Sequence, residues 1–94
     1  MEVRIWSVYD RDDRLVLILS DEPGDFNFTR IPDEDCDPVE CEYATIQCYR
    51  STIEPDVLNA VFRSTEVEEL LQRLKKGGYK VRNGRPTPAR FARL

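Results

Sequence analysis

The 94-residue sequence contains no histidine, and this absence is the first constraint on its chemistry. Without an imidazole the chain cannot form a Ser-His-Asp or Cys-His nucleophilic system, and it lacks the commonest metal ligand of proteins. Its four glycines form neither of the glycine-rich patterns that hold phosphate groups. A hydrolase built on two carboxylates stays compatible with the many acids, but no pattern places such a pair in an apolar cleft. We therefore predict a non-catalytic protein that needs no cofactor.

Cysteine is scarce, and its number is odd: the chain has Cys36, Cys41 and Cys48. An odd count in a small chain argues against a disulfide framework. Three thiols with no fourth soft ligand, at spacings that differ from those of a zinc knuckle, also argue against zinc. We expect Cys48 to be a small buried residue of a strand.

A calcium loop is the other metal site to consider, because Asp33, Asp35 and Asp37 alternate as the first three ligands of such a loop do. The pattern then fails. Pro38 stands where the loop needs glycine, and Thr45 stands where it needs glutamate. We predict no metal site, and interpret these acids as a solvated segment.

Long hydrophobic runs are also absent. The longest continuous apolar run covers residues 15–19, whereas a helix that spans a bilayer needs about 20 residues. The first residues lack the basic and apolar regions of a secretory signal. The sequence therefore predicts a cytoplasmic protein that does not contact a membrane.

The charges are strongly segregated along the chain. Residues 1–69 contain 18 acidic and 6 basic residues, a net charge of −12, whereas residues 70–94 contain 8 basic residues and no acid. Six of the acids fall within residues 33–42. Such asymmetry is typical of proteins with an acidic or a basic contact surface.

Hydrophobic periodicity predicts an α+β fold: an antiparallel sheet of four to five strands, with one main amphipathic helix and a short helix packed on one face. We expect a single domain over residues 1–84 and a basic, extended C-terminal tail over residues 85–94. The expected strands cover residues 3–9, 14–20, 26–31, 42–49 and 79–82, and residues 32–40 are expected to form an acidic loop. In the fourth strand we favour Ala44, Ile46 and Cys48 as the inward set.

Two helices are predicted over residues 55–63 and 65–76. Pro55 is typical of a first helical position, and Val57, Leu58, Val61 and Phe62 lie on one side of the first helix. The second helix is expected to begin with a capping box between Thr65 and Glu68 and to end at Gly77 in the left-handed conformation.

Charge segregation without catalytic motifs favours a small regulator or inhibitor that binds another protein, and a phage-type inhibitor is one form of this hypothesis. A basic partner would contact acidic side chains, and an acidic or amphipathic partner would contact the tail; the candidates are Asp33, Glu34, Asp35, Asp37, Glu40, Arg85, Arg90, Phe91 and Arg93. The alternative is a nucleic-acid-binding module that uses Lys80, Arg82, Arg85, Arg90 and Arg93. In a third arrangement the basic tail lies on the molecule's own acidic surface. A monomer and a homodimer are both compatible with the sequence.

Overall fold

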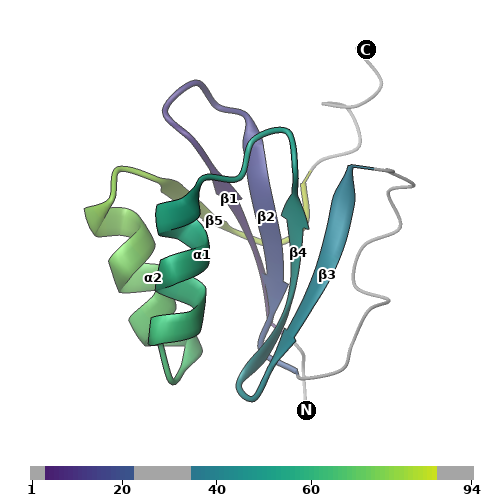
Figure 1. The fold of residues 1–94 in the computed structure, drawn as a ribbon, viewed down its shortest axis with the longest axis vertical. Helices are drawn as coiled ribbons and strands as arrows, with labels where there is room; N and C mark the ends of the chain where they lie inside the picture. Colours follow the sequence, from purple (N-terminus) through teal and green to yellow (C-terminus); the bar gives the residue numbers. More distant parts are fainter. Residues whose placement is uncertain (1–3, 23–34, 87–94) are drawn as a thin grey trace.

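The computed structural model describes residues 4–22 and 35–86 (Figure 1). They form seven elements: β1 (Ile5–Tyr9), β2 (Leu15–Ser20), β3 (Cys36–Cys41), β4 (Ala44–Tyr49), α1 (Pro55–Arg63), α2 (Val67–Lys76) and β5 (Lys80–Asn83). The five strands make one antiparallel sheet in the order β3-β4-β2-β1-β5, and both helices cover the same face. The predicted α+β class is therefore confirmed. No helix in these residues is long and apolar enough to cross a membrane.

β1 and β2 form a hairpin because the polar turn of residues 10–14 separates two strongly β-forming segments. Asp10 stabilises the turn: its Oδ1 accepts hydrogen bonds from the backbone N–H groups of Asp12 and Arg14, each at 2.9 Å. Asp13 adopts a left-handed conformation (φ 62°), which aspartate tolerates better than most residues. β2 lies in the middle of the sheet, and its residues 16–20 are buried on both faces, as its uninterrupted apolar sequence predicts.

β3 corrects the prediction of an acidic loop over residues 32–40. Its residues pair with β4 from Cys36↔Tyr49 to Cys41↔Ala44. Pro38 did not prevent strand formation, because β3 is an edge strand and proline is tolerated where its missing donor would point away from the sheet. The strand predicted over residues 26–31 lies outside the described residues.

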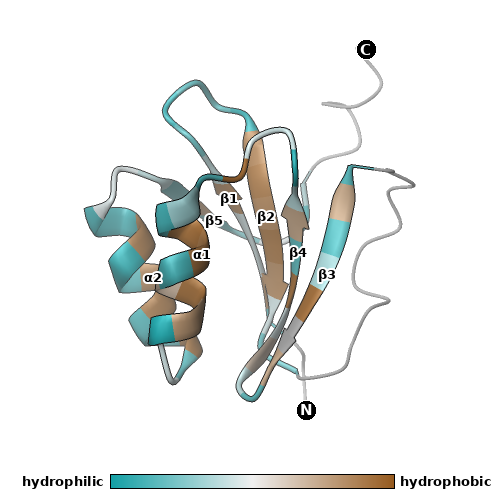
Figure 2. Cartoon of the chain, in the orientation of Figure 1, coloured by the Kyte–Doolittle hydropathy of each residue, from teal (hydrophilic) through white to brown (hydrophobic). Residues whose placement is uncertain are grey.

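The core lies between the sheet and the two helices. In β4, Ala44, Ile46 and Cys48 face the helices, as predicted, and join residues of β1 and β2 in one buried cluster. Figure 2 shows the apolar sides of both helices turned toward the sheet. Burial raises the pKa of the Cys48 thiol to about 12, with smaller contributions from Cys36 and Asp37. Cys48 is therefore a packing residue, as expected.

α1 begins and ends at the predicted residues, with Pro55 in the first turn. The expected apolar side is only partly correct. Val57 and Val61 are fully buried and Leu58 is partly buried, but Phe62 is 68% exposed. These four side chains span a wider arc around the helix axis than the part of α1 that contacts the sheet. Phe62 therefore faces outward.

α2 also has the predicted extent to within two residues, but both of its ends differ in detail. Thr65 makes no capping bond to the backbone; its N–H donates to Glu69 Oε1 at 2.7 Å, so Glu69 takes the part expected of Glu68. At the other end Gly77 is helical, with φ −77°. Gly78 instead takes the positive φ of +93°, because the chain turns one residue later than predicted.

Candidate partner-binding site

The acidic side chains proposed as a contact surface are bonded within the molecule where the structure describes them. Asp35 Oδ2 accepts a hydrogen bond from the Ser51 N–H at 2.8 Å, and Asp37 lies 3.3 Å from the Arg50 guanidinium. Hydrogen bonds from Ser51 lower the pKa of Asp35. These two acids connect β3 to the turn after β4. Asp33 and Glu34 lie outside the described residues, and the structure gives only the backbone of Glu40, within β3.

Of the basic residues in the nucleic-acid hypothesis, the three that the structure describes, Lys80, Arg82 and Arg85, lie in or just after β5, at the opposite edge of the sheet. Lys80 and Arg82 belong to β5, which pairs only with β1 in the described part of the chain. Lys80 Nζ lies 2.9 Å from Asp13 Oδ1, and the Arg82 guanidinium lies over the Tyr9 ring, 5.3 Å from its centroid. Both cationic side chains are on exposed residues. β5 therefore presents two ordered cations at an open strand edge.

The backbone of β5 also faces this open edge. Gly84 N–H donates to the Ile5 carbonyl at 2.6 Å, which makes Ile5 and Gly84 a hydrogen-bonded pair. Hydrogen-bonded pairs alternate along an antiparallel ladder, so Arg82 and Lys80 bond to β1 as well. The intervening residues, Val81 and Asn83, then direct their N–H and C=O groups away from β1.

Two further arginines lie where β5 ends. Arg4 and Arg85 line a cavity of about 480 Å³ together with Trp6 and Gly84. Arg4 lies 5.1 Å from the centroid of the Trp6 ring and pairs with Asp21 at 2.9 Å. Arg85 is exposed and forms no ion pair with any residue that the structure describes.

Sequence reasoning missed Arg4, which lies about 80 positions from Arg85 in the chain. Only the pairing of β1 with β5 brings these two arginines together, and no local pattern reports that pairing. Of the remaining predicted tail residues, Arg90, Phe91 and Arg93 lie outside the described part of the structure. Pro86, the last described residue, is buried.

The described cations of β5 do not neutralise the described acids of β3. The two strands are at opposite edges of a five-stranded sheet, four strand spacings apart. At about 4.8 Å per spacing, the separation is roughly 19 Å, which exceeds the screening length of about 8 Å at physiological salt. For these residues, the segregation of charge in the sequence becomes a separation in space.

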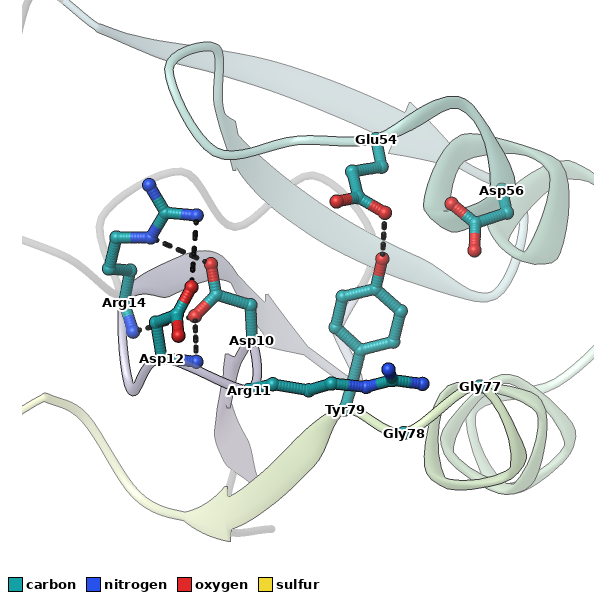
Figure 3. Close-up of a pocket in the computed structure, with 9 residues that line it drawn as sticks. All are labelled: Asp10, Arg11, Asp12, Arg14, Glu54, Asp56, Gly77, Gly78 and Tyr79. Atoms are coloured by element: carbon teal, nitrogen blue, oxygen red, sulfur yellow. Dashed lines mark hydrogen bonds and ion pairs between the residues drawn. The ribbon is translucent and has the colours of Figure 1, made fainter.

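A second cavity, of about 280 Å³, lies at the other end of the molecule, where three connections meet (Figure 3). Tyr79 donates its O–H to Glu54 at 3.0 Å, and burial together with this bond raises the pKa of Tyr79. Asp10 binds Arg14 at 2.9 Å, and although its desolvation acts in the opposite direction, the hydrogen bonds from Arg14 and Asp12 lower its pKa.

The lining of this cavity is charged rather than apolar, and its bonded side chains stabilise the connections that carry them. Asp10 has a lowered pKa, the opposite of what a general acid near neutral pH requires. Within residues 4–22 and 35–86, no group of three potential ligands is placed to hold a metal ion. The arrangement therefore gives no basis for a catalytic assignment.

Comparison with known proteins adds no family to this picture. No protein-family model matches the sequence, and neither the curated proteins nor the solved structures give a match.

Proposed function

We propose that this protein is a non-catalytic interaction module that binds a protein partner through the basic edge formed by β5 and Arg85. One observation carries the proposal: among the described residues β5 has an unpaired backbone edge that bears two exposed cations, whereas the outer edge of the acidic strand β3 is interrupted by Pro38, which has no N–H to donate. A strand edge of this kind is a ready template for pairing with another chain. The acidic contact surface expected from the sequence is therefore the weaker candidate.

A protein partner is favoured over nucleic acid by the aromatic residues of β1. Proteins that bind single-stranded DNA or RNA commonly use exposed aromatic rings, on which the bases stack. Here Tyr9 and Trp6 are only 3% and 7% exposed, and an arginine lies over each ring.

The test is capture and identification of partners from nuclease-treated extract of the native host, followed by titration of the purified partner. The double variant Lys80→Glu, Arg82→Glu is compared with wild type. A matched control, Arg63→Glu with Lys75→Glu, makes the same change in net charge on exposed helix positions. We expect the strand variant to weaken binding at least ten-fold, in line with the cost of placing like charges in a contact, and the control to retain it.

Two results would refute the proposal. Equal weakening by both double variants would show that only overall charge matters. Tight binding of DNA or RNA, with an affinity that falls log-linearly with salt and depends on Lys80 and Arg82, would establish the nucleic-acid alternative instead.

A further inference from the structure

We propose that the outward edge of β5 takes an extended acidic segment of the partner as an additional, antiparallel strand of the sheet. This inference rests on the proposed function, because it specifies how the same basic edge recognises its partner. Addition of a strand uses main-chain hydrogen bonds for affinity and alternate side chains for specificity. Both kinds of contact are available on β5.

The backbone contacts come from Val81 and Asn83, whose N–H and C=O groups point away from β1. An antiparallel strand placed beside them would exchange two hydrogen bonds with each residue. The whole described sheet is antiparallel, so the added strand would continue its geometry.

The side-chain contacts define the sequence of the partner. Lys80 and Arg82 are two residues apart, so they lie on one face of the sheet, and Val81 lies on the other, against the core. Toward an added strand, Lys80 and Arg82 would occupy the non-hydrogen-bonded positions, where facing side chains are closest. The complementary segment therefore has acidic residues two positions apart, with an apolar residue between them opposite Val81.

A second copy of this chain fits the outward edge of β5 less well than an acidic segment of another protein does. Antiparallel pairing of β5 with another β5 would place Lys80 or Arg82 against the same cations, and facing like charges are destabilising. The acidic edge strand β3 of another copy would offer opposite charge. However, Pro38 stands in a non-hydrogen-bonded position opposite Gln47, so its missing donor is on the outer edge that such pairing would use.

The probe is a synthetic peptide, acetyl-Glu-Val-Glu-Val-Glu-amide, titrated into the intact protein and followed by amide NMR. We expect the largest shifts, and slowed hydrogen exchange, at the Val81 and Asn83 amides. The matched controls are two N-methylated peptides. Methyl groups on the valine nitrogens remove donors that face β5 and should weaken binding about ten-fold or more, because about two hydrogen bonds are lost. Methyl groups on the second and third glutamate nitrogens face outward and should leave binding within about three-fold.

Charge is tested by Arg82→Glu, which we expect to weaken binding of the acidic peptide and to favour the Lys-Val-Lys-Val-Lys counterpart. Equal effects of the two methylation patterns, or shifts centred on β3, would overturn strand addition. If the acidic peptide does not bind but partner capture still requires Lys80 and Arg82, strand addition is wrong and the proposed function stands. If partner capture is also independent of these residues, both proposals fail.

Discussion

Adjacent residues of α1 give a direct test of how this helix packs. Val61 is fully buried in the core, whereas Phe62, the larger side chain, is 68% exposed. Val61→Ala removes two methyl groups, each worth about 0.8 kcal/mol of burial, and leaves a cavity, so we expect the free energy of unfolding to fall by about 2–3 kcal/mol. Phe62→Ala should change it by less than about 0.5 kcal/mol, because an exposed position contributes little.

The measurement is urea denaturation at 25 °C, followed by circular dichroism and by fluorescence of Trp6, the single tryptophan. Trp6 belongs to the same buried cluster as Val61, so its emission reports loss of this core. In thermal unfolding, 2–3 kcal/mol corresponds to a decrease in Tm of roughly 8–24 °C for a domain of this size. The partly buried Leu58 gives a third point, since Leu58→Ala should fall between the other two variants.

Side-chain size and burial in the structure predict opposite orders for the loss of unfolding free energy in the two alanine variants. The comparison therefore tests the packing of α1 directly. If size and hydrophobicity alone governed stability, Phe62→Ala would be the more damaging change. A loss of 2 kcal/mol or more at Phe62, with little loss at Val61, would mean that α1 is rotated relative to the packing described here. The assignment of the helix-covered face would then be wrong.

Three other predictions follow from edges, turns and the core. Pro38→Thr restores an outward N–H donor on the acidic edge strand β3, so we expect β3 of one copy to pair with β5 of another. Sedimentation velocity should then show salt-sensitive association, which Arg82→Glu should reverse. A strictly monomeric Pro38→Thr protein would contradict the idea that Pro38 prevents this pairing. The folded-state pKa of Asp10 is lowered, so its stabilising effect is present above its unfolded value near 3.8 and is lost as the pH falls below that value. Asp10→Asn keeps an Oδ1 acceptor but loses the charge. The denaturation midpoint of this variant should therefore depend less on pH between about 5 and 2 than that of wild type. If the two proteins show the same pH dependence, Asp10 does not contribute to acid unfolding. Burial raises the pKa of the Cys48 thiol to about 12, so Cys48 should resist a thiol reagent at pH 8 until urea unfolds the chain. The less buried Cys36 and Cys41 should react first. Rapid labelling of all three cysteines in the folded state would contradict the burial of Cys48.

The local pattern of the sequence determined most of the elements and their inward faces. Pro55 and the apolar repeat of residues 67–74 define the two helices, and alternation in residues 44–48 identifies which side of β4 is buried. These features depend on the intrinsic periodicity of strands and helices, which is encoded within a few neighbouring residues.

Tertiary structure alone decided the rest, because it depends on pairings between distant segments. Residues 36–41 have the acids and proline of a loop, yet they form β3 because β4 supplies a hydrogen-bonding partner and the edge position tolerates Pro38. The same order of strands leaves β5 at the open edge and brings Arg4 near Arg85. The order of charges along the sequence therefore indicated that charge is segregated, but only strand order placed the described acids of β3 and the cations of β5 at opposite edges of the sheet.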